Sequence, residues 1–290
     1  MESLLRRKAT EKGCLVASHR GAWGGNVIQN TMQAFRNALL QGADVLETDV
    51  VPCLDGSLWC FHDGSEKKVF GEKTDIFAMT EEKLLSLAPV NAYEQPVRAR
   101  VPRFEEALAL AVREGTVLNI DRAWDWTDRV VKVLDSVRGA EEVCLMKAPV
   151  TKGQAAMEFL AVHPVKYPFM AICYTWEDVE AALRVKGLRL EAVEMIAFDE
   201  KSPLFGQDAV RRAHDRGLLA WVNAIRLGDG LRDRLYAGLD DDRSIAISPE
   251  EGWLRLRDMG FDIIQTDWPA AVKVALEKEK ENGGQIKVRC

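Results

Sequence analysis

The stretch GADVLETDVV, residues 42–51, reads as a buried strand that carries two acidic residues. Apolar and mostly β-branched residues surround Glu47 and Asp49, a composition typical of a strand covered on both faces. Alternate residues of a strand point the same way, so the two carboxylates are expected on one face, a few ångströms apart. Burying both in ionised form is costly unless an Arg, a Lys or a cation neutralises them.

Strand-like runs of this kind recur along the chain, and most are separated by segments with helical spacing of apolar residues. Several of these segments end in glycine just before the next strand, as helices commonly do. Strands alternating with helices in this way predict an α/β protein built as a (β/α)8 barrel. A doubly wound open sheet is the alternative, but no GxGxxG motif follows the first strand. The eight runs are CLVAS (14–18), VLETDV (45–50), TVLNID (116–121), VCLMK (143–147), FMAIC (169–173), AVEMIAF (192–198), LLAWVNA (218–224) and DIIQTD (262–267).

The stretch that follows the second strand is too long for a simple strand-to-helix connection. Residues 57–63, SLWCFHD, read as a strand that pairs back after the CLDGS turn. The rest of the stretch is polar and mixed, which predicts a small insertion over about 52–112. We therefore expect one domain over residues 1–290, with a charged tail that frays over about 279–290.

The composition is that of an ordinary globular protein, with 47% hydrophobic and 29% charged residues. A net charge of −6 argues against a nucleic-acid partner. No apolar run is long enough for an integral membrane segment, and the N-terminal residues lack the apolar core of a signal peptide, so a cytoplasmic protein is expected. The six cysteines show no metal-binding spacing, and most lie in apolar contexts that suit reduced, buried thiols.

Acidic residues gather at the predicted strand ends, where a barrel of this type carries its chemistry. Glu47 and Asp49 lie on the second strand, and Asp121 ends the third. Each alone is compatible with a structural ion pair. Together they form an oxygen-rich site that favours one divalent cation, Mg²⁺ or Ca²⁺, over zinc.

Two histidines lie at neighbouring strand ends, His19 after the first strand and His62 after the returning strand. Either alone is compatible with a structural role, but as a pair beside a cation they suit general acid and base catalysis on a phosphodiester. Lys147 ends the fourth strand and is expected either to contact the substrate or to reach the rim and pair there. Trp23, in the loop GAWGGN, and Trp221, near a strand end, are candidates for lining the substrate pocket; the alternative for Trp221 is a place in the core.

The order of these residues resembles the glycerophosphodiester phosphodiesterase family, within the PI-PLC-like phosphodiesterase superfamily of TIM barrels. The match is specific over residues 14–63 and continues more weakly at 118–121, 221–223 and 266–269. Its elements in the first part are His19-Arg20-Gly21, Asn30-Thr31, Glu47-Thr48-Asp49-Val50, Asp55-Gly56 and His62-Asp63.

The resemblance implies a TIM barrel with an insertion after the second strand, and hydrolysis of glycerophosphodiesters to sn-glycerol 3-phosphate and an alcohol. It implies that Glu47, Asp49 and Asp121 bind the metal, with Asp121 where the family usually has glutamate. His19 and His62 match the acid–base pair, and Arg20 matches an arginine that contacts phosphate. In the mechanism usually drawn, the glycerol 2-hydroxyl attacks phosphorus, and water then opens the cyclic phosphate.

Two positions depart from the family pattern. Gln29 replaces the usual glutamate before Asn30, and Ala123 replaces a lysine that normally contacts phosphate, so Lys147 is the candidate to replace it. The chain is therefore expected to be a divergent member. Two alternatives stay open, a lyase that stops at the cyclic phosphate and a non-catalytic barrel that binds a phosphorylated ligand. The sequence leaves the head group and the oligomeric state open.

Overall fold

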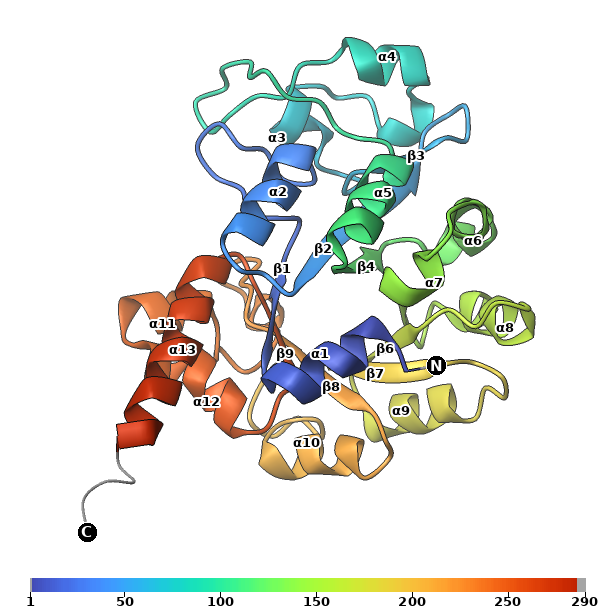
Figure 1. The fold of residues 1–290 in the computed structure, drawn as a ribbon. Coiled ribbons are helices and arrows are strands. Elements are labelled where there is room, and N and C mark those ends of the chain that lie inside the picture. The colour runs from blue at the N-terminus through green and yellow to red at the C-terminus, as the bar shows by residue number, and fades with distance from the viewer. Residues whose placement is uncertain (1, 286–290) are drawn as a thin grey trace.

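Eight parallel strands close into a barrel in the computed structural model, which describes residues 2–285 (Figure 1). Strand β1 closes the ring because it pairs with β2 on one side and with β9 on the other. The predicted (β/α)8 barrel is confirmed, and all eight strands end at the same edge. The barrel strands are β1 (Leu15–Ser18), β2 (Val45–Pro52), β4 (Val117–Asp121), β5 (Cys144–Pro149), β6 (Phe169–Cys173), β7 (Leu190–Met195), β8 (Leu219–Asn223) and β9 (Ile263–Thr266).

Helices cover the outside of the barrel and bury their apolar faces against the strands. Local signals set their limits. The Thr31 hydroxyl accepts a hydrogen bond from the backbone N–H of Ala34 and begins α2, and Gly115 ends α5 in the left-handed conformation. The covering helices are α2 (Met32–Leu40), α5 (Phe104–Glu114), α6 (Thr127–Ser136), α7 (Ala140–Val143), α8 (Gln154–Val162), α9 (Trp176–Leu183), α10 (Gln207–His214), α11 (Asp241–Ala246), α12 (Trp253–Asp258) and α13 (Pro269–Gln285). Short 3-10 helices are η1 (Ile76–Ala78), η2 (Trp124–Trp126), η3 (Leu231–Asp233) and η4 (Pro249–Glu251).

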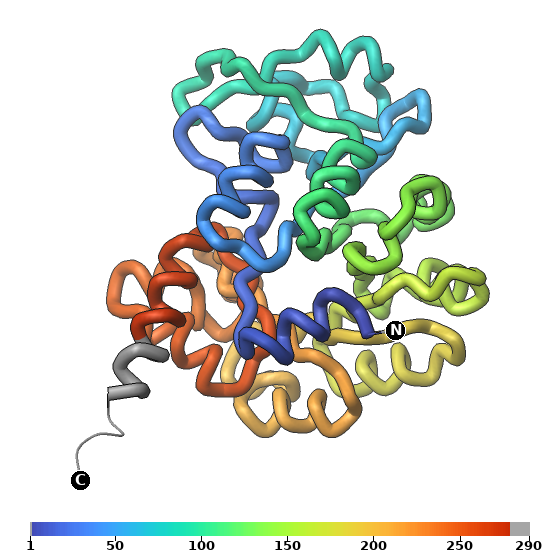
Figure 2. The backbone as a smooth tube through the Cα atoms, in the orientation of Figure 1, coloured from blue at the N-terminus to red at the C-terminus, as the bar shows by residue number. Residues whose placement is uncertain are grey.

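Helix α1 (Leu4–Lys12) closes the end of the barrel opposite the strand C-termini (Figure 2). Its Leu5 and Ala9 pack against apolar side chains from the beginnings of the strands, including Leu15 and Val45. This cluster fills the lower barrel and shields it from water. Polar side chains in the interior are therefore confined to the upper half, near the strand C-termini.

The segment between β2 and α5 forms a separate unit above the barrel (Figure 1). Strand β3 (Leu58–Cys60) runs antiparallel to β2, as the sequence predicts, and is followed by α3 (Glu66–Phe70), η1 and α4 (Glu81–Ser86). These elements have their own apolar cluster, which includes Trp59, Phe61 and Ile76. Helix α5, by contrast, packs in the main core with the other barrel helices.

The predicted frayed tail, about 279–290, lies largely outside what the structure describes, since side chains are described only as far as residue 278. Within the described residues, every helix is too short or too polar to cross a membrane.

Gly21 lies just after β1, so close to α2 that no side chain fits. Its φ is +77°, and a Cβ at this position would lie 2.6 Å from the carbonyl carbon of Ala34 and 2.7 Å from the Cβ of Ala34. The neighbouring Ala22 also donates a backbone hydrogen bond to the Ala34 carbonyl at 3.0 Å. Glycine thus lets the chain turn against α2, and this turn positions the two residues before it, His19 and Arg20.

We predict that Gly21→Ala lowers the free energy of unfolding by roughly 2 kcal/mol or more, because it adds both backbone strain and a steric overlap. Urea denaturation measures the loss. Gly25→Ala is the matched control, since Gly25 has a φ of +58° but open space around it, and it should cost only about 1 kcal/mol. Equal losses in the two variants would show that contact with α2 does not constrain this position.

Candidate active site

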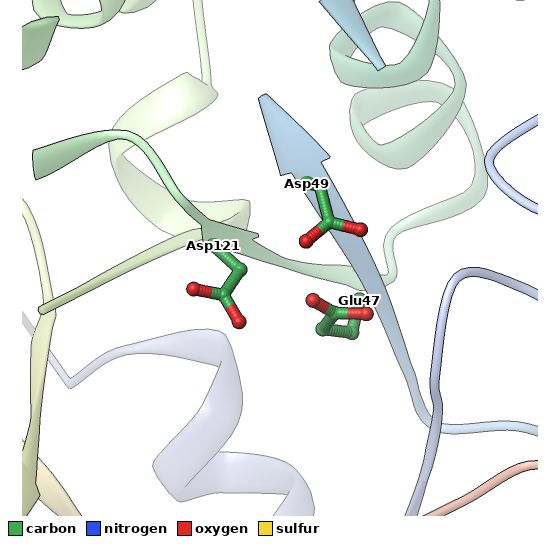
Figure 3. Close-up of side chains that lie close together, drawn as sticks. All are labelled: Glu47, Asp49 and Asp121. Atoms are coloured by element: carbon green, nitrogen blue, oxygen red, sulfur yellow. The ribbon is translucent and has the colours of Figure 1, made fainter. Parts of the chain in front are cut away.

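Three carboxylates meet at the upper edge of the barrel, two from β2 and one from the end of β4. The strand register places Asp49 opposite Asp121 and Glu47 opposite Asn119. One oxygen of Glu47, one of Asp49 and one of Asp121 all lie within 4.8 Å of one another, and Figure 3 shows the three groups around one space. Oxygen ligands at this spacing suit a hard divalent cation.

The electrostatics of this cluster favour a cation. Glu47 Oε1 is buried without a hydrogen-bond partner. Burial, followed by the charge of Asp49, raises the pKa of Glu47 to about 7. Such a pKa marks a carboxylate whose charge is poorly compensated by the protein, which a bound divalent cation would correct. The residues present therefore fit the metal that the sequence predicts.

Arg20 contacts both β2 carboxylates. Its backbone N–H donates to Glu47 Oε2 at 2.9 Å, and its Nε forms an ion pair with Asp49 Oδ2, also at 2.9 Å. Asn30 donates from Nδ2 to the same Asp49 oxygen at 2.9 Å and accepts from the Thr48 hydroxyl at 2.9 Å. Arg20 and Asn30 both have positive φ, +56° and +55°, so the chain tolerates backbone strain to hold Asp49.

His19 is oriented by a carboxylate from the last strand end. Its Nδ1 lies 2.8 Å from Asp267 Oδ1, a distance at which Nδ1 donates to the carboxylate and Nε2 is the other ring nitrogen. Burial works to lower the pKa of His19, but the bond to Asp267 and the charge of Glu47 outweigh it and raise the pKa. Asp267 therefore favours a His19 that has accepted a proton.

His62 is fixed by its own loop. Its Nδ1 donates to the backbone carbonyl of Asp63 at 2.7 Å, which again leaves Nε2 as the other ring nitrogen. The Asp63 carboxylate accepts a bidentate pair of hydrogen bonds from Arg122, from Nε to Oδ1 at 2.9 Å and from Nη2 to Oδ2 at 2.6 Å. Arg122 has a φ of +61° and follows Asp121 directly, so this pair ties the His62 loop to the end of β4.

Lys147 points into the barrel and is only 3% exposed. Its Nζ lies 2.8 Å from Asp121 Oδ2 and 3.2 Å from Glu194 Oε2. Burial works to lower the pKa of Lys147, but Asp121, Glu194 and Glu47 outweigh it and raise the pKa. Lys147 is therefore a fixed cation inside the site, and the rim position considered from the sequence is wrong.

Glu194 is a site residue that the sequence reasoning missed. It is 4% exposed, and Asn223 Nδ2 donates to its Oε1 at 2.8 Å. The available signal was a single acidic residue inside the apolar run AVEMIAF. With Glu194 included, four carboxylates lie close together in the upper barrel. Arg20 forms an ion pair with Asp49, and Lys147 forms ion pairs with Asp121 and Glu194.

A cavity of about 310 Å³ opens over these groups at the strand C-termini. It brings together six residues predicted from the sequence, while Glu47 lies below it. The six are His19, Arg20, Asp49, His62, Asp121 and Lys147.

The two predicted tryptophans lie elsewhere. Trp221 is fully buried in the lower cluster and donates from Nε1 to Asn223 Oδ1 at 3.2 Å, so its place is in the core. Trp23 lies beside Lys68, whose Nζ is 5.2 Å from the ring centroid, and lines a separate space of about 120 Å³. The cavity over the carboxylates is lined instead by Trp124 and Tyr174.

Comparison with known proteins identifies the family. A model described as "Glycerophosphoryl diester phosphodiesterase family" matches residues 19–271. The chain belongs to this family. The family resemblance inferred from the sequence is thus confirmed.

Individual relatives in the family are distant. A glycerophosphodiester phosphodiesterase of Bacillus altitudinis is 35% identical over 108 residues, which cover 37% of this chain and 44% of that protein, less than half its length. A glycerophosphoryl diester phosphodiesterase from Parabacteroides distasonis ATCC 8503 superimposes with a TM-score of 0.72 and 20% identity, covering 91% of this chain and 86% of that one. An Oleispira antarctica phosphodiesterase, solved with the product sn-glycerol-3-phosphate, superimposes with a TM-score of 0.64 and 17% identity, covering 91% of this chain and 96% of that one. At these identities the solved structures establish the shared barrel.

Asp241 holds the strand end that carries Asp267. It is 3% exposed and accepts hydrogen bonds from the Thr266 hydroxyl at 2.7 Å, the Asp267 backbone N–H at 2.9 Å and Trp253 Nε1 at 2.7 Å. Burial raises the pKa of Asp241 to about 7, although these donors favour the charged form. Asp241 thus fixes the backbone on which the partner of His19 depends.

We predict that Asp241 makes stability depend on pH. The folded-state pKa of about 7 lies above the ordinary value of 3.8. The contribution of Asp241 to the free energy of unfolding is therefore complete below about pH 4 and is lost as the pH rises through 7. The free energy of unfolding of the wild type minus that of Asp241→Asn should therefore become smaller between pH 4 and 7, by up to roughly 4 kcal/mol. Urea denaturation at several pH values measures this difference.

Asp242→Asn is the control for this prediction. Asp242 is adjacent in sequence but its side chain is 65% exposed, so its replacement should leave the pH dependence almost unchanged. A difference between wild type and Asp241→Asn that is constant or grows from pH 4 to 7 would contradict the assignment.

Proposed function

We propose that the protein is a divalent-metal-dependent phosphodiesterase that hydrolyses glycerophosphodiesters to sn-glycerol 3-phosphate and an alcohol. One observation carries this proposal: three carboxylates within 4.8 Å of one another share a site with two histidines whose Nδ1 atoms are both engaged. Membership of the family supports it. The sn-glycerol-3-phosphate bound to the Oleispira antarctica enzyme supports the choice of product.

Glu47, Asp49 and Asp121 would hold the cation, which supplies charge neutralisation to the phosphoryl oxygens when bound. Asn30 and Arg20 hold the Asp49 carboxylate in place, and Arg20 is also the side chain proposed to contact phosphate. Lys147 adds a positive charge that is already present before substrate binds, held by Asp121 and Glu194. It takes the place of the lysine that the family has at position 123, where Ala123 is fully buried.

His19 and His62 divide the proton transfers. The Asp267 carboxylate stabilises a protonated His19, so His19 is proposed to accept the proton of the attacking hydroxyl at Nε2. His62, whose Nδ1 partner is only a backbone carbonyl, is proposed to donate a proton from Nε2 to the leaving alkoxide. In the route that the family resemblance implies, the attacking group is the glycerol 2-hydroxyl, and water then opens the cyclic phosphate.

The proposed function predicts cation-dependent turnover of a simple glycerophosphodiester such as the ethyl ester. Removal of the metal with a chelator should abolish release of glycerol phosphate, and Mg²⁺ or Ca²⁺ should restore it. The cation should also raise the melting temperature, because a ligand bound only by the native state stabilises it. Isothermal titration calorimetry should show weaker binding in Asp49→Asn.

The outcome that would end this proposal is full activity in chelator together with unchanged cation affinity in Asp49→Asn. Phosphorus NMR of the product gives a second readout. Accumulation of a cyclic phosphate would replace the hydrolase by a lyase, while the metal assignment would stand.

The histidine pair predicts a loss of kcat with cation affinity retained. His19→Ala and His62→Ala should each lower kcat on the order of a hundredfold or more. His214→Ala is the matched control, because His214 ends α10, pairs with Asp262 at 2.8 Å and does not line the cavity. Near-normal turnover by either active-site variant would remove that histidine from the mechanism.

A further inference from the structure

The cavity over the site has two unlike walls. Strand ends β1, β2, β4 and β9 supply charged or polar side chains, His19, Asp49, Asp121 and Gln265. On the opposite side, at the ends of β5, β6, β7 and β8, one apolar residue from each strand end lines the cavity, and these are Pro149, Ile172, Ile196 and Ile225. Deeper on this side the cavity also contacts Lys147, Glu194 and Asn223, and the exposed Lys152 follows β5.

The apolar wall continues to the rim along the segment that follows β8. This segment folds back on the end of β7, where Ala197 donates to the Leu235 carbonyl at 2.9 Å and accepts from the Ala237 N–H at 2.6 Å. Arg226 and Arg234 pair across the same segment as an antiparallel bridge. These bonds give Leu235 and Leu227 fixed positions at the mouth of the cavity.

Two exposed side chains extend the wall outward. Leu227 is 59% exposed and Tyr174 is 39% exposed, and the Tyr174 ring lies 5.9 Å from the ring of Phe198. Glu194 is the acidic residue among the described residues that line this wall. Both of its carboxylate oxygens accept hydrogen bonds, one from Lys147 and one from Asn223. This side therefore offers an ammonium head group no free carboxylate among the described lining residues and places Lys147 and Lys152 near it, whereas its apolar side chains offer contact to an alkyl chain.

We infer that the substrate is a glycerophosphodiester whose leaving alcohol carries an unbranched apolar chain, which lies along this wall. The inference rests on the proposed function and specifies its substrate class. The charged half of the cavity takes the phosphoryl group and the glycerol hydroxyls, so the other ester substituent faces the isoleucines. Hydrolysis breaks the bond between phosphorus and the alcohol oxygen, and the alcohol leaves with the proton donated by His62.

The test is a series of glycerophosphoryl esters of ethanol, butanol and hexanol, with the choline and ethanolamine esters for comparison. Each methylene transferred from water to an apolar surface contributes at most about a fourfold increase. We expect kcat/KM to rise by up to that factor for each methylene from the ethyl to the hexyl ester. We also expect kcat/KM for the choline ester to be lower than that for the butyl ester.

The outcomes separate this inference from the proposed function. Turnover of the ethyl ester with rates that stay flat or fall along the series would overturn the apolar subsite and leave the phosphodiesterase in place. No cation-dependent turnover of any ester would overturn the proposed function, and the subsite with it.

Variants locate the subsite. Leu227→Asn should reduce the dependence of kcat/KM on chain length, and so should Ile225→Asn. Leu227 is exposed, so its replacement still tests the subsite if replacement of the buried Ile225 prevents folding. Leu54→Asn is the matched control, since Leu54 is 61% exposed but lies in the turn after β2, away from the cavity, and it should keep the full dependence. Because each slope is measured within one variant, a partly unfolded preparation does not change it, and an unaltered slope in Leu227→Asn would overturn the assignment.

Discussion

Repulsion between carboxylates that are held a few ångströms apart inside the barrel is the constraint on which the upper half of the structure depends. Glu47 and Asp49 point to the same side of β2 because they are two residues apart, and pairing of β2 with β4 adds Asp121 beside them. Glu47 and Asp49 are buried from water, so the charge that compensates them must come from the protein or from a bound cation. The positive φ of Arg20, the inward path of Lys147 and the bidentate Arg122–Asp63 pair each serve this requirement, directly or by holding the loops around it.

The sequence contains local information on part of this arrangement. The alternation within β2 puts Glu47 and Asp49 on one face, and the recurrence of strands and helices predicts the barrel and the edge at which polar residues meet. The strand pattern also places Lys147 at this edge, although it left open whether the side chain turns inward or reaches the rim. These features depend on residues near one another in the chain, where periodicity is informative.

Other features depend on pairs that are distant in sequence, and no periodicity encodes them. Arg122 follows Asp121 directly in the chain, yet its guanidinium binds Asp63, 59 residues away. Glu194 and Asn223 join the site only because β7 and β8 lie across the barrel from β4. Trp221 could not be placed from the sequence for a different reason. An indole near a strand end suits a pocket or a core equally well, and its height within the barrel decides between them.

Closure of the ring at β1 has a kinetic consequence. Strand β1 has four residues and hydrogen-bonds to β9, and the His19–Asp267 contact beside that seam spans 248 positions. During synthesis the ribosome releases His19 long before Asp267, so His19 lacks this partner until nearly the whole polypeptide has emerged. Contacts of such high sequence separation form late, since the entropy of closing the intervening loop is lost before they are gained. Docking of β9 on β1 is thus also the step that brings Asp267 to His19, and a chain truncated before β9 would lack the carboxylate that orients His19.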